Sequence, residues 1–312
     1  MRALVPDQQG SVEIADVEEP IETPGATLID VRAFSPNRGE TFLMSSPLDG
    51  WRPGKDVAGV ISTAGGHFPL GTRVVAHTPS HGWAERALVP EAAVAVLPES
   101  VSFDIAAALP LAGLTALRLL QTAGSLVGRT LLITGASGGV GHYVVELAVA
   151  AGAEVTAVTA SLERGARLRE LGASIVTDVE QAPGSFDVAM ESVGGLSLPA
   201  VRRKVRPDGL IIWFGQASLQ PPTLDFFDWV GGGAGAPIVQ FHYQRTPTQD
   251  GRDLRTLVRL TDTDRLHPEI GSTLPWERTA DVIAAIRGRS LRGNAVLTIT
   301  AASSKESTHE VH

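Results

Sequence analysis

The stretch LLITGASGGVGHYVVELAVAAGAEVTAVTAS, residues Leu131–Ser161, decides the fold class of the chain. It contains an apolar run, a glycine-rich turn, a run with helical periodicity and a second apolar run. Short apolar runs are typical of buried strands, and the order strand, turn, helix, strand is the βαβ unit of a parallel sheet. The stretch therefore predicts an α/β fold with a doubly wound parallel sheet.

The turn within this stretch has the glycines of a dinucleotide-binding turn. Such glycines permit a tight bend, let backbone approach a pyrophosphate and let the helix pack closely on the strand. Gly138, Gly139 and Gly141 follow a predicted strand and begin a predicted helix, although Ala136 stands where the first glycine is usual. The N–H groups at the start of that helix would bind the phosphates. A purely structural turn is the alternative interpretation.

The end of the second apolar run indicates which dinucleotide is bound. NAD enzymes usually carry Asp or Glu there, about 20 residues past the glycines, to bind the ribose 2′-hydroxyl. This chain has Ser161 instead, and Arg164 lies in the next predicted helix. A hydroxyl and a guanidinium suit a 2′-phosphate, so we predict NADPH as the cofactor. Glu163 is a competing acid, and a solvated Arg164 is the alternative.

The composition sets the class of protein and excludes several others. The chain has 312 residues, 43% of them hydrophobic and 19% charged, which is enough for two globular domains. Its 34 acidic and 26 basic residues give a formal charge of −8, which argues against a nucleic-acid partner. It has no cysteine, so disulfides and thiolate-ligated zinc are impossible. We see neither a signal peptide nor a membrane-spanning run, and we expect a cytoplasmic protein.

The rest of the chain divides into three parts. The first hundred residues contain β-rich segments such as ATLIDVRAF and DVAGVIST, followed by a helical segment, Ser100–Ser125, broken at Pro110. Strands then alternate with helices up to a candidate sixth strand, Pro237–Tyr243, and LPAVRRKVRPDG is predicted as a helix closed by Pro207 and Gly209. The helices and the strand that follow are assigned back to the first domain. We expect domains at residues 1–100 with 255–302 and at 101–254, and a disordered tail at 303–312.

Several motifs, taken in their order along the chain, resemble those of a known family. They are SPNRGE, PGKDVAGVI, GTRVVA, WAERALVP, AALPLAGLTAL, ASGGVG, ESVGG, WFGQAS and LRGNAVL. The family is the medium-chain dehydrogenase/reductases, specifically the zinc-free, zeta-crystallin-like branch of quinone oxidoreductases, and the resemblance covers about residues 1–300. It implies a GroES-like β-rich catalytic domain split around a Rossmann domain, an active site in the cleft between them, and commonly a homodimer.

The resemblance also implies roles for individual residues. The ASGGVG turn would hold the pyrophosphate, Thr115 would lie beside the nicotinamide, and Phe241 and Asn294 would close over the nicotinamide side. Other residues would line the cofactor at the carboxyl edge of the sheet, where open α/β sheets bind ligands. The implied cofactor-binding residues are Thr115, Ser137, Gly138, Gly139, Val140, Gly141, Ser161, Arg164, Ser192, Val193, Phe214, Gly215, Phe241 and Asn294.

Two departures from the family pattern concern metal and cofactor. Lys55 and Asp56 stand where the metal-binding relatives have His and Glu, and we expect no metal. The spacing of His67, His77 and His81 is not that of a helical metal-binding pair. Asn294 replaces the lysine that is usual near the last strand.

Candidates for catalysis are few. Asn37 has an amide that would hold a substrate carbonyl, with a turn-stabilising role as the alternative. Tyr243 follows the candidate sixth strand and would donate a proton, with a packing or interface role as the alternative.

These features predict an NADPH-dependent reductase that transfers hydride to a quinone or an α,β-unsaturated carbonyl without zinc. Its partners would be a small-molecule substrate and a second copy of the chain, with no nucleic acid and no membrane. One alternative is a biosynthetic enoyl reductase or redox-tailoring or cyclase enzyme of the same fold. Another is a non-catalytic protein that binds or senses NADPH.

Overall fold

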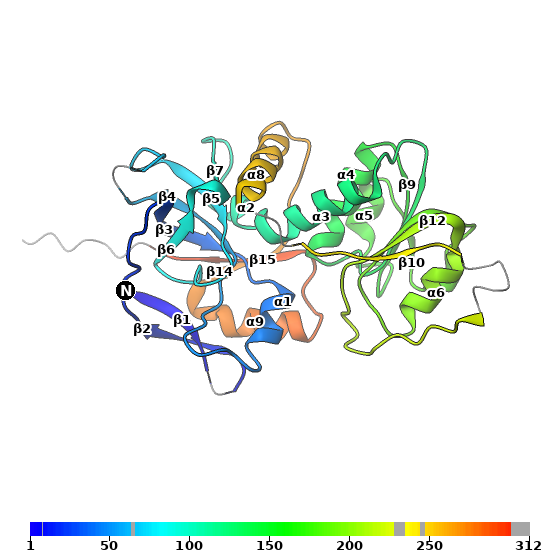
Figure 1. Ribbon diagram of the computed structural model, residues 1–312, viewed down its shortest axis with the longest axis horizontal. Coiled ribbons are helices and arrows are strands. Elements are labelled where there is room, and N and C mark those ends of the chain that lie inside the picture. Colours follow the sequence, from blue (N-terminus) through cyan, green and yellow to red (C-terminus); the bar gives the residue numbers. More distant parts are fainter. Residues whose placement is uncertain (8, 64–65, 228–234, 244–246, 301–312) are drawn as a thin grey trace, which may run out of the picture.

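Two open sheets form the two halves of an elongated molecule (Figure 1). The computed structural model describes residues 1–300 except 8, 64–65, 228–234 and 244–246. The predicted tail at 303–312 lies outside the described residues. The helices described are α1 Arg38–Leu43, α2 Phe103–Ala107, α3 Pro110–Ala123, α4 Gly139–Ala150, α5 Ala166–Glu170, α6 Ser197–Lys204, α8 Pro247–Asp262 and α9 Thr279–Arg287, with 3₁₀ turns η1 Glu91–Ala93, η2 Val179–Gln181 and η3 Trp276–Arg278.

The predicted doubly wound parallel sheet is confirmed. Its strand order is β10-β9-β8-β11-β12-β13, and every neighbouring pair is parallel. The strands are β8 Thr130–Ile133, β9 Glu154–Val158, β10 Ser174–Val176, β11 Phe186–Glu191, β12 Val205–Trp213 and β13 Ile238–Gln240. The order reverses at β8, between β9 and β11, so a crevice is expected beyond the carboxyl ends of these strands.

The other sheet, which comes first along the chain and is therefore the first sheet, combines the two ends of the chain. Its order is β14-β15-β3-β4-β5-β7, with β6 also pairing to β3. The strands are β3 Ala26–Phe34, β4 Asp56–Ile61, β5 Arg73–His77, β6 Arg86–Pro90, β7 Val94–Val96, β14 Ile270–Pro275 and β15 Asn294–Thr298. A separate hairpin joins β1 Arg2–Pro6 to β2 Val12–Asp16. β15, from the C-terminal segment, thus pairs with β3 from the N-terminal part of the chain.

Helix α3 lies between the two sheets (Figure 1) and packs against α4, α8 and β5. The predicted break at Pro110 is confirmed, since Pro110 is the first residue of α3 and α2 ends before it. The helix ends at Gly124, whose φ of 77° is a left-handed conformation that glycine adopts without strain. Helix α8 packs on β5 and β7, and the predicted domain boundary after residue 254 falls within it. The division into domains stays a prediction.

Two predicted elements were wrong in extent. Helix α6 ends at Lys204 and β12 begins at Val205, which pairs with Phe186. The register then shifts, and residues 206–209, which include Pro207 and Gly209, form an irregularity inside β12. Proline and glycine are tolerated in a strand at such a place, so here they mark a bulge and not a helix end. The sixth strand is confirmed but covers only three residues, Ile238–Gln240.

No helix in the described part of the chain is long and apolar enough to cross a membrane.

Candidate active site

The glycine turn between β8 and α4 requires its glycines for steric reasons. A Cβ on Gly141 would lie 2.2 Å from the carbonyl oxygen of Ala136, so the first turn of α4 packs directly on the strand end. Gly135 has a φ of 63° and takes the left-handed conformation. Ala136 is thus not a lost turn glycine, because the sharp bend occurs one residue earlier.

The N-terminus of α4 presents backbone N–H groups without a capping side chain. Its N-cap is Gly138, which has no side chain to accept them. A Cβ on Gly139 would lie 2.4 Å from Asn294 Oδ1, so Asn294 lies against the glycine turn. Val140 follows in the same first turn of the helix and is half-buried. An uncapped start of a 12-residue helix, beside a turn too close for side chains, fits a phosphate group.

Ser137, Ser161 and Arg164 come together at the end of β9. The Arg164 Nε donates to Ser137 Oγ at 3.2 Å, and the Arg164 backbone N–H donates to Ser161 Oγ at 3.3 Å. The guanidinium also donates to the carbonyl oxygen of Leu291 at 2.6 Å. Arg164 lies just before α5 and not in a helix, contrary to the sequence prediction. Ser161 and Arg164, which the sequence analysis paired, therefore lie next to the glycine turn, and Ser137 adds a second hydroxyl.

The carboxyl ends of β8 and β11 are tied together by a buried polar group. Ser192 Oγ donates to the carbonyl oxygen of Thr134 at 3.0 Å, and the Ser192 N–H donates to Thr134 Oγ1 at 3.0 Å. Glu191 Oε1 accepts the N–H of Val193 at 2.8 Å. Burial raises the pKa of Glu191, and hydrogen bonds from Val193 and Gly194 oppose that rise only in part. This group fixes the loop that carries Ser192 and Val193.

Other predicted cofactor residues lie at the same edge of the sheet. The Phe214 N–H donates to the carbonyl oxygen of Glu191 at 2.9 Å, and Gly215 follows it. The Phe241 N–H donates to the carbonyl oxygen of Trp213 at 2.9 Å, so Phe241 leaves β13 beside the end of β12. Thr115, which is 7% exposed, lies on α3, and its place beside the nicotinamide stays a prediction.

Asn37 belongs to a buried carboxylate group in the first sheet. Its Nδ2 donates to Asp56 Oδ2 at 2.8 Å and to the carbonyl oxygen of Ser35 at 3.2 Å. Its backbone N–H donates to Glu40 Oε2 at 3.0 Å. Both amide protons of Asn37 are therefore engaged, and its role toward a substrate stays a prediction.

The two carboxyl groups beside Asn37 are unusually buried. Glu40 is 0% and Asp56 is 1% exposed, and sequence reasoning assigned Glu40 no role. Burial raises the pKa of Glu40 to about 7, although its hydrogen bonds from Gly54 and Asn37 lower it. Burial also raises the pKa of Asp56 well above its ordinary value, and the nearby Glu40 adds to the rise.

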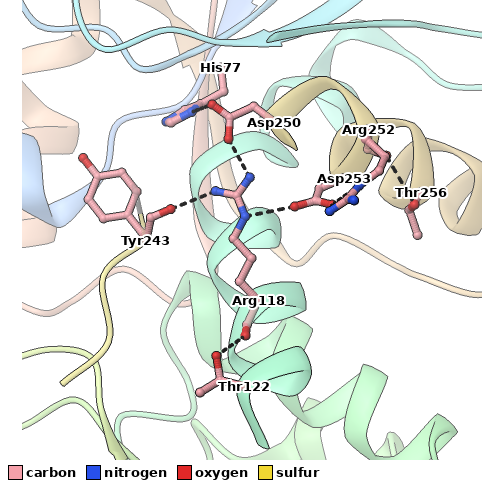
Figure 2. A network of polar contacts seen from close by, with 8 residues as sticks. All are labelled: His77, Arg118, Thr122, Tyr243, Asp250, Arg252, Asp253 and Thr256. Carbon is pink, nitrogen blue, oxygen red and sulfur yellow. Dashed lines mark hydrogen bonds and ion pairs between the residues drawn. The ribbon is translucent and has the colours of Figure 1, made fainter. Parts of the chain in front are cut away.

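Tyr243 has partners on both its ring and its backbone. Lys55 Nζ donates to the Tyr243 hydroxyl oxygen at 2.6 Å, although the two residues are 188 positions apart. Figure 2 shows Arg118 Nη1 donating to the carbonyl oxygen of Tyr243, at 2.8 Å. The ring of His77 lies edge-on to the phenol, with centroids 6.3 Å apart. Sequence reasoning named Tyr243 but had no signal for Lys55 or Arg118 as its partners.

The residues at the metal-ligand position do not fit zinc. Lys55 points its ammonium at Tyr243, and an ammonium has no lone pair for a metal. His77 Nδ1 lies 3.3 Å from Asp250 Oδ2, whereas His81 Nε2 lies 3.1 Å from the carbonyl oxygen of Gly50. Within the described ranges, no group of three or more His, Cys, Asp or Glu side chains is placed to hold a metal ion.

A mostly antiparallel sheet built from both ends of the chain, a doubly wound parallel sheet and a glycine turn after its strand β8 are typical of nucleotide-binding oxidoreductases. The sequence model of the zinc-binding dehydrogenase family matches residues 139–234. The quinone oxidoreductase of Sus scrofa is 30% identical over 308 residues, which are 91% of this chain and 92% of that protein. The quinone oxidoreductase of Pongo abelii is 37% identical over 182 residues, which span 55% of its length.

A plant relative and a solved structure extend the comparison. The 2-methylene-furan-3-one reductase of Solanum lycopersicum is 33% identical over 223 residues, 62% of this chain and 57% of that protein. The Escherichia coli quinone oxidoreductase complexed with NADPH has a TM-score of 0.86 at 19% identity, covering 96% of this chain and 99% of that chain. The chain belongs to the medium-chain dehydrogenase/reductase family, in its quinone oxidoreductase-like branch. It is an oxidoreductase by class.

Proposed function

We propose that the chain is an NADPH-dependent, zinc-independent reductase that transfers hydride to a quinone or an α,β-unsaturated carbonyl compound. The observation that carries this proposal is the uncapped N-terminus of α4 beside the Ser137–Ser161–Arg164 group. A helix start suits the pyrophosphate, and a guanidinium bonded to one serine hydroxyl, with a second serine hydroxyl on its own backbone N–H, suits a 2′-phosphate.

The chain's own residues would bind and orient the cofactor. Gly138 to Gly141 would cradle the pyrophosphate with backbone N–H groups, and Arg164 would turn from the Leu291 carbonyl toward the 2′-phosphate. Thr115, Ser192 and Phe241 would position the nicotinamide at the carboxyl edge of the sheet. When bound, NADPH supplies a hydride to the substrate. Because Asn294 lies against Gly139, we expect it to face the phosphates and not the nicotinamide.

The absence of zinc is the second part of the proposal. It is supported by the lack of cysteine and by the Lys55 ammonium at the position where metal-binding relatives have histidine. Elemental analysis of the purified protein is expected to find less than about one tenth of a zinc ion per chain, a criterion set by the one-ion stoichiometry of a zinc site. Activity is expected to survive prolonged treatment with a chelator.

The test of the function begins with the full chain and NADPH alone. Titration is expected to show saturable NADPH binding, with NADH bound at least about tenfold more weakly. Loss of NADPH absorbance is then followed with 1,4-benzoquinone, 9,10-phenanthrenequinone, 2-cyclohexenone and trans-2-nonenal as separate substrates. Turnover of at least one of them is expected. Tight NADPH binding without turnover of any substrate would instead favour a binding or sensing protein, and equal or tighter NADH binding contradicts the NADPH assignment.

We also propose that the protein forms a homodimer through β13. This strand is at one edge of the parallel sheet and exposes Val239 at 40% of its surface. Phe226 and Phe227, exposed at 67% and 75%, lie in the segment between β12 and β13. An edge strand with apolar side chains nearby is a surface on which a second strand pairs. Light scattering in solution measures the molecular mass of the particle and so distinguishes a dimer from a single chain.

A further inference from the structure

Lys55 and Tyr243 form an ion–phenol pair. Lys55 Nζ donates to the phenol oxygen at 2.6 Å and lies 4.9 Å from the centroid of the ring. Lys55 is only 9% exposed, so this cation is largely removed from water. The bond uses a lone pair of the phenol oxygen and leaves the phenol proton free. In the described part of the chain, no acceptor takes that proton.

A buried arginine holds the tyrosine in place. Arg118 is 0% exposed, and its Nη1 donates to the carbonyl oxygen of Tyr243 at 2.8 Å. Its Nη2 and Nε donate to Asp250 at 2.5 Å and to Asp253 at 3.0 Å, both on α8 (Figure 2). A guanidinium with two carboxylate partners and a backbone partner has little freedom to move. The position of Tyr243 is thus set by α3 and α8 together.

The pair lies where the substrate side of the cleft is expected. Tyr243 follows Phe241 by two residues beyond the carboxyl end of β13. Arg118, which holds it, follows Thr115 by one turn on α3. Thr115 and Phe241 are the residues proposed to flank the nicotinamide. The phenol therefore stands between the two sheets, next to the proposed site of hydride transfer.

We propose that Lys55 and Tyr243 are catalytic residues that bind and protonate the oxygen of an α,β-unsaturated ketone or aldehyde. This inference rests on the proposed function and names its substrate class. Addition of hydride to the β-carbon breaks the C=C π bond and moves an electron pair onto the carbonyl oxygen, giving an enolate. The Tyr243 O–H bond then breaks and its proton passes to that oxygen. The enol becomes the saturated carbonyl compound by exchange of a proton with water.

Lys55 stabilises the phenolate that the proton transfer leaves on Tyr243, until a proton from solvent restores the phenol. After the transfer, the phenolate oxygen carries a negative charge 2.6 Å from the Lys55 ammonium. A charge-assisted hydrogen bond in a site shielded from water stabilises that charge more than the neutral phenol. A proton from solvent then restores the phenol. The charged groups around the phenol are Lys55, Arg118, Asp250 and, when protonated, His77.

The pair favours enones over quinones for a chemical reason. Reduction of an enone leaves an enolate, whereas reduction of a quinone leaves the much less basic anion of a hydroquinone. The weaker base is stable enough to leave the site as an anion, so its formation gains less from a positioned acid. Loss of the pair is therefore expected to slow enone reduction far more than quinone reduction.

The experiment compares both substrate types in the same variants. In Tyr243→Phe and Lys55→Met, kcat for 2-cyclohexenone is expected to fall about 100-fold or more, within the range of general-acid catalysis. The kcat for 9,10-phenanthrenequinone is expected to fall less than about tenfold, because its product needs no positioned acid. The Kd for NADPH is expected to change less than about twofold, since no phosphate contact is removed. Lys204→Met is the matched control. Lys204 is the last residue of α6, and its ammonium donates to the carbonyl oxygens of Glu180 in η2 and of Ala182 just after it.

A second readout separates chemistry from structure. We expect the wild-type protein to show a solvent deuterium isotope effect on kcat for the enone. We expect this isotope effect to change in Tyr243→Phe, a change that a purely packing role of Tyr243 would not produce. Unchanged enone turnover in both variants, or an equal loss for the two substrates with unaltered isotope effects, overturns the assignment. A wild-type protein that binds NADPH but reduces neither substrate overturns the proposed function itself, and this result differs from a loss confined to the variants.

Discussion

At the scale of single residues, Arg164 is held by neutral partners at the place where we propose a 2′-phosphate binds. Its guanidinium is held by the carbonyl oxygens of Ser290 and Leu291 and by the hydroxyl of Ser137. A carbonyl oxygen is a weaker partner for a guanidinium than a phosphate, which carries full charge. The side chain is thus kept near the proposed 2′-phosphate site by hydrogen bonds to neutral oxygens. It would exchange these bonds for bonds to the phosphate at a small cost in free energy.

Arg164→Ala is expected to reduce coenzyme selectivity. Loss of one charge-assisted contact to a phosphate corresponds to roughly tenfold or more in affinity for NADPH, whereas the affinity for NADH stays within about twofold. Titration of both coenzymes measures the ratio. Arg169→Ala, at an exposed position of α5, is the control and is expected to leave both affinities unchanged. Equal weakening of both coenzymes by Arg164→Ala would show that the residue only supports the loop.

The sequence indicated the residues of the glycine turn and its neighbours, and it named Tyr243, but it gave no signal that Lys55 is the partner of Tyr243. Ser137, Ser161 and Arg164 lie in one βαβ unit, whose geometry is known once its strands are recognised. Lys55 directly precedes β4, whereas Tyr243 is held through Arg118 of α3, and 188 positions separate the two residues. No local periodicity carries that information.

At the scale of elements, a residue of the first sheet caps the N-terminus of α3, the helix that lies between the two sheets. Asp56 begins β4, and its Oδ1 accepts the N–H of Leu111, the second residue of α3, at 2.9 Å. The residue at the N-cap position is Leu109, which has no side-chain acceptor. Asp56, from a distant part of the chain, therefore accepts the N–H that an N-cap side chain would otherwise accept.

Asp56→Ala is expected to lower the free energy of unfolding by about 2–3 kcal/mol, because it leaves the buried Leu111 N–H without its acceptor and removes one of the acceptors of the Asn37 amide. Urea unfolding followed by circular dichroism measures it. Ser102→Ala removes the exposed cap of α2, where Ser102 Oγ accepts the Ile105 N–H, and is expected to cost about 1 kcal/mol or less. A smaller loss for Asp56→Ala than for Ser102→Ala would contradict this account.

The elements themselves were predictable where periodicity is strong. The order β8, α4, β9 follows from apolar runs on both sides of a glycine turn, and the structure keeps it. The start of β12 was not predictable, because Pro207 and Gly209 in a helix-like context usually end a helix. Here the pairing of Val205 with Phe186 overrides local preference, as tertiary contacts often do.

At the scale of the whole molecule, the buried carboxyl of Glu40 links stability to pH. Its pKa is about 7 in the folded protein and 4.5 ordinarily, so the folded state binds more protons between these values. Stability therefore falls as pH rises through this window, by about 3 kcal/mol for this group. The raised pKa of Asp56 acts with the same sign.

Glu40→Gln is expected to flatten the pH dependence of the free energy of unfolding, since an amide does not titrate. The variant is expected to be less stable overall, because one backbone N–H loses its carboxylate acceptor. The free energy of unfolding measured from pH 5 to pH 8, a window spanning the shift in pKa, tests the difference in slope. Glu170→Gln, at a surface carboxyl paired with Arg167, is the control and is expected to keep the wild-type slope. An equally steep slope in Glu40→Gln would show that other groups carry the pH dependence.

The place of β15 in the first sheet has a consequence for how the chain is made. β15 pairs with β3 through Leu297 and Phe34, so this sheet joins strands from opposite ends of the polypeptide. During synthesis β3 to β7 emerge early, and β6 pairs with Ala26–Asp30 of β3, yet the Ala33–Phe34 end of this edge stays unpaired until Asn294–Thr298 leave the ribosome. The parallel sheet is complete once β13 has emerged. Nascent chains thus carry one finished sheet and one open strand edge, the state in which a holding chaperone would be needed most.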